Sequence, residues 1–130
     1  MNRKRVCEWI QNRFSVEPDY PFPRDGESAV FRHSDNRKWF AIMMHVPFKV
    51  LGLPGEGRTD ILNVKCDPFI AGSFRSMRGI LPAYHMSKTQ WITILLDGTV
   101  EESVVKSLLE ISYDLTDGSG KRCRQKADKA

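Results

Sequence analysis

Cysteine is scarce in this sequence and long apolar runs are missing, and each absence excludes a class of protein. The three cysteines, Cys7, Cys66 and Cys123, are widely spaced and form neither a Cys-x-x-Cys pair nor a Cys/His cluster. We therefore expect no disulfide framework, no metal site and no cofactor. No stretch approaches the ~18 apolar residues of a membrane span, and polar residues at 8–13 interrupt any signal peptide. A reducing cytoplasm and no membrane partner are expected.

A nucleotide-binding loop is also missing. Glycines recur between Gly52 and Gly57, but no Gly-Lys-Ser/Thr follows and no helix pattern begins at Gly57. The segment is better explained as the tip of a long hairpin. Such a tip has the shape of a wing that fits a groove.

The excess of positive charge belongs to the C-terminal residues. The whole chain carries +4, and residues 118–130 hold five basic side chains against one acidic one, which is also +4. Residues 1–117 are therefore formally neutral. We expect residues 1–116 to form one domain and residues 117–130 a disordered basic tail. The tail would either aid solubility or tether the protein to nucleic acid or anionic lipid.

Hydrophobic periodicity and turn signals predict eight elements in the order α-β-β-β-α-β-β-α. The Asp67-Pro68 pair is typical of a helix start, and Thr99-x-x-Glu102 has the spacing of a capping box that opens the last helix. This order indicates an α+β fold with helices packed on one face of an antiparallel sheet. We expect helices at 2–15, 68–77 and 99–115, and strands at 28–33, 38–46, 60–66, 80–85 and 90–96. The buried stripe of the last helix should hold Val104, Leu108, Ile111 and Leu115, widened by Val105 and Leu109.

Alternation along the predicted strands assigns side chains to the two faces of the sheet. Leu62, Val64 and Cys66 should face the helices, which leaves Asn63 and Lys65 on a face open to water or a partner. Aromatic rings interleaved with cations suit base stacking and phosphate contact. The alternative is that Trp91 merely shields the sheet. The candidate binding residues on this face and the adjoining turns are Lys38, Asn63, Lys65, Arg75, Arg78, Tyr84, His85, Lys88 and Trp91.

Five segments resemble the MmcQ/YjbR family of small bacterial proteins. They are Arg37-Lys-Trp-Phe-Ala41, Asn63-Val-Lys-Cys-Asp-Pro68, Pro82-Ala-Tyr-His-Met-Ser-Lys-x-x-Trp91, Leu96-Asp-Gly98 and Ser112-Tyr-Asp-Leu115. The resemblance covers about residues 2–116. It implies the frataxin/CyaY-like α/β sandwich and a double-wing arrangement associated with DNA binding. Ala83 stands where the family commonly has glycine.

Two other functions are weighed against DNA binding. Iron binding of the frataxin type needs a ridge of carboxylates, whereas the first helix starts Arg3-Lys-Arg5. Catalysis by Cys66 as nucleophile and His85 as base is a distant third hypothesis, because Cys66 falls on the predicted core face. We predict a monomeric, non-enzymatic DNA-binding module. The runner-up is a protein- or small-ligand-binding domain that uses the same Tyr84–Trp91 face.

Overall fold

A computed structural model describes residues 1–22, 28–74 and 76–117. Its strands form one antiparallel sheet in the order β1-β2-β3-β5-β4. The elements are α1 (Arg3–Phe14), β1 (Ala29–Arg32), β2 (Trp39–Pro47), the 3-10 turn η1 (Phe48–Leu51), β3 (Arg58–Lys65), α2 (Pro68–Phe74), β4 (Ile80–Pro82), β5 (Trp91–Leu95) and α3 (Glu102–Thr116). The predicted α+β class and element order are confirmed. Arg75 and residues 118–130, which include most of the predicted tail, lie outside the described residues.

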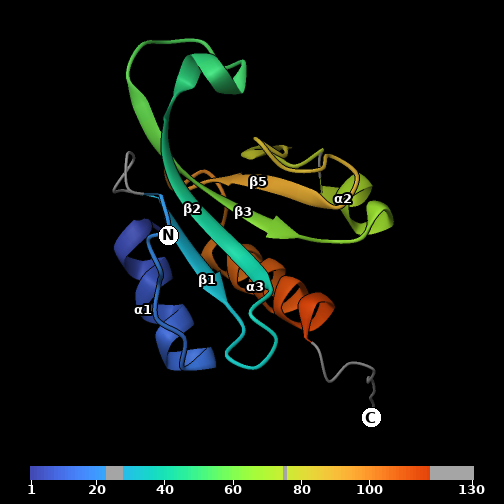
Figure 1. Ribbon diagram of the computed structural model, residues 1–130. Coiled ribbons are helices and arrows are strands. Elements are labelled where there is room, and N and C mark those ends of the chain that lie inside the picture. The colour runs from blue at the N-terminus through green and yellow to red at the C-terminus, as the bar shows by residue number, and fades with distance from the viewer. Residues whose placement is uncertain (23–27, 75, 118–130) are drawn as a thin grey trace.

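The three helices share one hydrophobic core with one face of the sheet. Val6 from α1, Ala71 from α2 and Leu108 from α3 are buried together with Leu62 and Val64 of β3. Figure 1 shows α1 and α3 on the same side of the long strands β2 and β3, with α2 beyond the end of β3. Leu62 and Val64 are residues that the alternation in the sequence predicted to face the helices. Side chains two residues apart in a strand point to the same face of the sheet.

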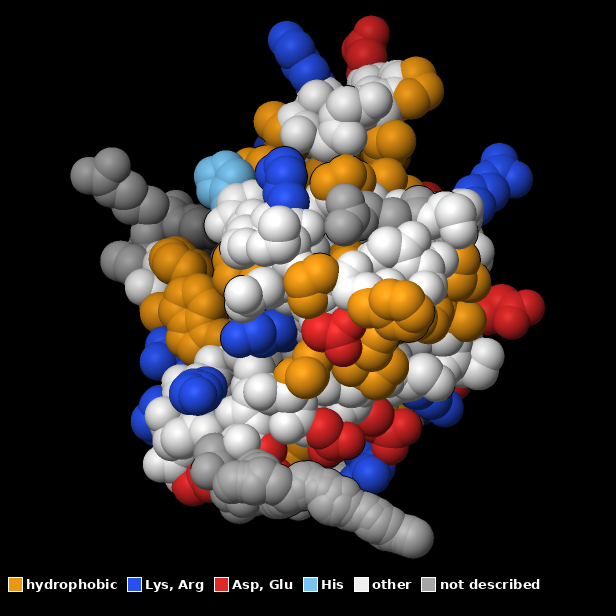
Figure 2. All heavy atoms as spheres, turned by 90° about the vertical axis from the view of Figure 1, so that its right-hand side faces the viewer, with side chains coloured by type: hydrophobic (Ala, Val, Ile, Leu, Met, Phe, Trp, Pro, Cys, Tyr) orange, Lys and Arg blue, Asp and Glu red, His pale blue; other side chains and the backbone are white. Residues whose placement is uncertain are grey.

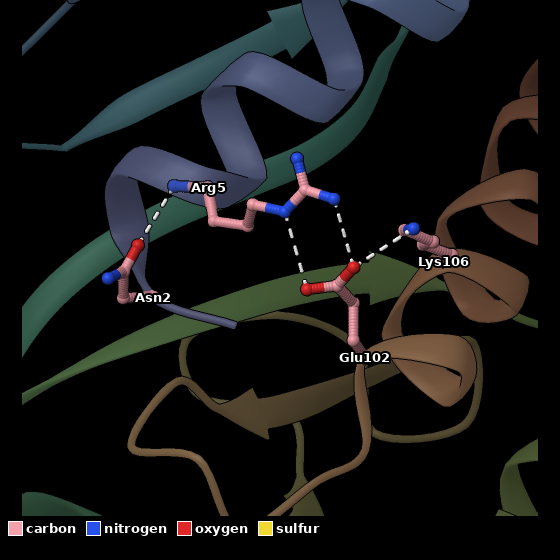
Figure 3. A network of polar contacts seen from close by, with 4 residues as sticks. All are labelled: Asn2, Arg5, Glu102 and Lys106. Atoms are coloured by element: carbon pink, nitrogen blue, oxygen red, sulfur yellow. Dashed lines mark hydrogen bonds and ion pairs between the residues drawn. The ribbon is translucent and has the colours of Figure 1, made fainter.

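Polar contacts fix the start of α1 and join it to α3. The side chain of Asn2 accepts a hydrogen bond from the Arg5 amide at 2.9 Å, as expected of a helix-capping residue. The Arg5 guanidinium donates two hydrogen bonds to the Glu102 carboxylate, at 3.0 and 3.3 Å, and Lys106 lies 3.0 Å from the same carboxylate (Figure 3). Glu102 therefore links the first turn of α3 to α1.

The opposite face of the sheet is covered, so the expectation of an open face is wrong. Two further clusters of buried residues lie on that face. One contains Val30, Ile42, Ala83 and Trp91, and the other contains Val46, Ile61 and Leu95. The covering side chains come from the segment between β4 and β5 and from the hairpin that follows β2, and they are Leu51, Leu53, Tyr84 and Met86. Apolar residues on both faces of β2 reflect this double covering.

The last helix begins later than predicted, and its buried stripe matches the prediction only in part: Val105, Leu108 and Leu109 are buried as expected. The helix begins at Glu102, so Thr99 is not its capping residue. Instead, the Thr99 amide donates to the Asp97 carboxylate at 3.0 Å within a turn. Leu115 is 44% exposed, whereas Ser112 and Thr116 are buried. The Ser112 hydroxyl donates to the Phe40 carbonyl and accepts from the Lys65 amide at 2.8 Å. Two hydroxyl residues thus occupy core positions because they satisfy polar groups there.

Candidate functional site

Residues 83–90 form a crossing loop, which joins β4 to β5 and lies over the second face of the sheet. Tyr84 packs against the cluster of Val46, Ile61 and Leu95, and Met86 packs against the cluster that contains Trp91. Trp91 is only 9% exposed. Its ring therefore shields the sheet, as the alternative interpretation of the sequence held, and cannot stack on a ligand.

A closed set of hydrogen bonds holds the crossing loop to the middle of the sheet. Asn63 and Thr93 are a cross-strand pair of β3 and β5, and both are fully buried. The Asn63 amide nitrogen donates to the Tyr84 carbonyl at 3.1 Å. The Thr93 hydroxyl accepts from the Tyr84 amide at 2.9 Å and donates to the Asn63 side-chain oxygen at 2.5 Å. Asn63 is thus a positioning residue for the loop and makes no contact with a ligand.

Further hydrogen bonds close the loop on itself and on β3. The Lys88 ammonium donates to the Ala83 carbonyl at 2.9 Å, and the Trp91 amide donates to the Ser87 carbonyl at 2.9 Å. The Cys66 amide donates to the Gln90 carbonyl at 2.8 Å, so the end of the loop lies beside the end of β3. Backbone held at this many points is pre-organised, which lowers the entropy cost of ligand binding.

The outer surface of the loop presents two rings. His85 is exposed and has a positive φ of 61°, in the left-handed region that few residues other than glycine adopt. The Tyr84 and His85 rings lie 4.1 Å apart with 33° between their planes. The hydrogen bonds of Tyr84 fix the residue that precedes His85. The fold therefore holds His85 in its strained conformation.

Three candidate cations gather at the end of the sheet where β2 begins, β3 ends and β5 begins. Lys38 precedes β2, Lys65 ends β3 opposite Trp91, and Lys88 precedes β5. Within the part of the chain that the structure describes, none of the three forms an ion pair, whereas Arg5 and Arg13 of α1 and Lys106 of α3 do. Toward the left of Figure 2, several Lys and Arg side chains lie close together with few acidic ones between them.

The remaining candidates do not join this group. Arg78 precedes β4, whose first residue pairs with Ile94 near the other end of β5. It lies near Asp97: burial raises the pKa of that carboxyl, but hydrogen bonds from Thr99 and the charge of Arg78 bring it below its usual value. Arg75 is outside the described residues. The nine predicted residues are therefore not one surface.

The catalytic hypothesis for Cys66 and His85 is wrong. Cys66 is 0% exposed and belongs to the core under the helices, whereas His85 lies on the crossing loop over the opposite face of the sheet. The sheet separates the thiol from the imidazole. Among the described residues, no group of three or more His, Cys, Asp or Glu side chains could hold a metal ion. In the same residues, no helix combines the length and apolar character needed to cross a membrane.

Known proteins share this fold and much of this sequence. The chain is 39% identical over 116 residues to "Uncharacterized protein YyaQ" of Bacillus subtilis (strain 168), an alignment that covers 89% of this chain and 98% of that protein. A crystal structure of a Pseudomonas syringae protein has a TM-score of 0.88 and 42% identity, and covers 90% of this chain and 100% of that one. A Deinococcus radiodurans protein with a DUF419 domain shares the fold, with a TM-score of 0.69 at 24% identity over 93% of this chain and 82% of that one.

The family assignment rests on a match over nearly the whole described domain. The YjbR family model matches residues 6–115, which include the Asn63–Pro68 segment, the crossing loop and most of α3. The chain belongs to the YjbR family.

Proposed function

We propose that this protein is a non-enzymatic DNA-binding module whose binding surface is the crossing loop and the adjoining end of the sheet. One observation carries the proposal: the exposed His85 ring and the half-buried Tyr84 ring lie together on the loop that ends beside three cations, none of which forms an ion pair among the described residues. Lys38, Lys65 and Lys88 would contact phosphates. The two rings would pack on sugar or base.

Charge segregation supports this surface, although the domain as a whole is neutral. Arg5, Arg13 and Lys106 form ion pairs with two carboxylates of α3, Glu102 and Glu110, on the helix side of the sheet. The cations near the crossing loop keep their full charge for a partner. A local positive surface attracts a polyanion even when the net charge of the domain is zero.

The hairpin tip proposed as a wing lies at the opposite end of β2. The tip comprises η1 and the glycine-rich residues up to Gly57, and in Figure 1 it extends beyond the rest of the sheet. β2 has nine residues, so its two ends are separated by roughly 26 Å at ~3.3 Å per residue. The tip would therefore contact DNA only as a second, separate point.

Binding of a fluorescent random-sequence duplex across a salt series tests the proposal. The measurement uses the full chain and a truncation that ends at Asp117, because the basic residues after Asp117 would bind DNA by charge alone. We expect the truncation to bind, with a slope of log affinity against log salt concentration (the salt slope) of about −2 to −3. Three phosphate contacts release that many counterions.

Two substitutions locate the surface. Lys65→Ala should weaken binding and reduce the slope by about 1. Lys4→Ala is the matched control, because Lys4 is an exposed cation of α1 that forms no ion pair among the described residues, and it should leave binding unchanged. If only the full chain binds, or if both variants lose the same affinity, the domain surface is not a DNA site. A partner of another class should then be sought for the Tyr84–Trp91 region.

A further inference from the structure

Phe69 is the most solvent-exposed large hydrophobic side chain of the described residues. It is 85% exposed, whereas the next in order, Tyr20, is 52% exposed. Phe31 and Phe40 are fully buried, and Phe14 and Phe74 pack against the main core. A single exposed apolar side chain is common on protein surfaces, so a role for Phe69 depends on what lies beside the ring.

The contacts that hold α2 in place do not involve Phe69. The Asp67 carboxylate accepts from the Ile70 amide at 2.9 Å and caps α2. Ala71 is buried in the main core, and Ile70 and Phe74 pack against it. Phe69 therefore occupies a fixed place on the surface but contributes little to holding α2 there.

The place of Phe69 is next to the proposed binding surface. It follows Lys65 by four residues, and the Cys66 amide is hydrogen-bonded to Gln90 at the end of the crossing loop. Two residues lie between Cys66 and Phe69, and the three steps from one Cα atom to the next span at most about 11 Å. Figure 1 accordingly shows α2 beside the start of β5.

The surroundings of the ring leave room for a flat ligand. Gly72 and Ser73, on the next turn of α2, are exposed, and a Cβ added at Gly72 would meet nothing within 4 Å. The described part of α2 has no charged side chain. A planar, uncharged group could therefore lie on Phe69 while a phosphate reaches Lys65.

We propose that Phe69 is a stacking platform for an unpaired nucleobase, so that the surface prefers single-stranded to double-stranded DNA. This inference rests on the proposed function and narrows its ligand. Every base offers an aromatic face for stacking in a single strand, whereas in a duplex those faces are covered by neighbouring bases. An exposed ring beside phosphate-binding cations is the arrangement that single strands require.

The test compares three oligonucleotides of equal length on the chain that ends at Asp117. They are a single strand of mixed sequence, the same strand with abasic sites throughout, and the duplex. The single strand should bind most tightly. The abasic strand has the same phosphates without bases, and its affinity should fall by about 5- to 100-fold, the range for loss of one stacked base.

Variants of Phe69 should reproduce that loss. Phe69→Ala and Phe69→Leu should both weaken binding of the intact single strand by about 5- to 100-fold and leave the abasic strand and the salt slope unchanged. Phe69→Trp should retain the affinity. Leu115→Ala is the matched control, since Leu115 is 44% exposed on α3, on the helix side of the sheet, and it should change nothing. Phe69→Leu keeps an apolar side chain, so an effect shared with Phe69→Ala reflects the ring.

The failure of this inference can be told apart from failure of the proposed function. If the duplex binds with the expected salt slope and Phe69→Ala leaves every affinity unchanged, the stacking inference is wrong and the DNA surface remains. If Phe69→Ala weakens the abasic strand as much as the intact one, Phe69 does not contact bases. If none of the three oligonucleotides binds, the proposed function itself is wrong.

Discussion

Asn63 and Thr93 show how a buried polar pair can determine the path of a loop. Their three hydrogen bonds with each other and with the Tyr84 backbone replace contacts that water would otherwise make. Asn63→Ala should lower the free energy of unfolding by about 2–3 kcal/mol, because in a dry site it leaves the Tyr84 carbonyl without its donor and the Thr93 O–H without an acceptor. Urea unfolding measures the loss.

Amide exchange at the crossing loop tests the positioning role directly. In Asn63→Ala, the amides of Tyr84 and His85 should exchange faster than those of β2, since local opening of the loop becomes easier. Asn12→Ala is the control, because Asn12 is an exposed amide residue of α1, and its stability should change by less than about 0.5 kcal/mol. Unchanged exchange at Tyr84 would mean that apolar packing alone holds the loop.

His33 makes stability depend on pH near neutrality. It is 2% exposed, lies against the Tyr113 ring at 4.2 Å and makes a 2.7 Å hydrogen bond with the Thr116 hydroxyl. Burial lowers the pKa of His33 below its usual 6.5, although nearby carboxylates, Asp117 first, oppose the shift. The unfolded chain therefore binds a proton at a higher pH than the folded one. The free energy of unfolding should fall as the pH drops below about 6.5 and level off below the folded pKa.

A His33 variant separates this effect from other titrations. His33→Gln should be less stable than the parent at pH 7.5 by about 2 kcal/mol, because it loses ring packing, and its stability should change less between pH 7.5 and 5.5. His85→Gln replaces an exposed ring and should keep the parental slope. Equal slopes in the parent and His33→Gln would contradict the assignment. Denaturant unfolding at a series of pH values supplies the data.

Alternation predicts which way a strand residue points but not what lies above it. Asn63 lies on the predicted face, yet it and its cross-strand partner Thr93 are buried because residues 83–90 fold over them. The sequence in and around β3 does not indicate that a loop after β4 will cover this strand. A polar residue at an alternating position is usually exposed. The positions of Lys65 and Lys88 near the strand ends could be predicted, because turn residues in the sequence indicate well where strands end.

At the scale of elements, Glu102 is one of two carboxylates of α3 that pair with an arginine of α1, and Glu110, which pairs with Arg13, is the other. Hydrogen bonds from Arg5 first and Lys106 second bring the pKa of Glu102 from 4.5 to about 2. A lowered folded pKa stabilises the protein above pH 4.5, and this contribution is lost as the pH falls from about 4.5 to about 2. The residues are exposed, so solvent keeps the effect small.

Acid unfolding of a matched pair of variants tests this link. Glu102→Gln should lose less stability than the parent between pH 4.5 and 2, because it has no carboxylate to protonate. Glu8→Gln should follow the parent, since Glu8 is an exposed carboxylate of α1 that forms no ion pair among the described residues. Parallel acid curves for Glu102→Gln and the parent would show that the pair contributes nothing to stability. Urea midpoints at each pH give the comparison.

Element types could be predicted from the sequence, and so could the C-terminal end of α3 and half of its buried stripe, but its first residue and its buried hydroxyl residues could not. The capping-box spacing at Thr99 is real, yet Asp97 binds the Thr99 amide in a turn and Val100 is buried, and the helix begins at Glu102. The stripe of Val104 and Leu115 was favoured because both are apolar. Ser112 faces the core instead because it supplies hydrogen bonds where β2 and β3 lack them.

At the scale of the whole molecule, the sheet is a partition between two apolar layers. Helices cover one face, and the crossing loop and hairpin cover the other. Residues of β5 are consequently buried on both sides, from Trp91 to Leu95. The double covering leaves neither sheet face open to a ligand in the part of the chain that the structure describes, so the proposed surface lies on the outside of the loop and at the strand ends near Lys38, Lys65 and Lys88.

Charge is also distributed unevenly over the whole chain, and this leads to a prediction about association. Because residues 118–130 carry the entire net charge of +4, the chain that ends at Asp117 is formally neutral. We expect the truncation to keep the parental free energy of unfolding within about 0.5 kcal/mol, since the removed residues contribute charge and no predicted core position. Near neutral pH and low salt it should self-associate more than the full chain, because repulsion between molecules is lost.

Light scattering at equal protein concentration measures this association. A full-length variant with Lys121, Arg122, Arg124 and Lys126 replaced by glutamine retains the length of the tail without its main charges, and should scatter like the truncation. Raising the salt should remove the difference between the full chain and both altered forms, since screening weakens the repulsion that keeps the full chain apart. If the glutamine variant stays as dispersed as the full chain while the truncation associates, the length of the tail and not its charge keeps the molecules apart.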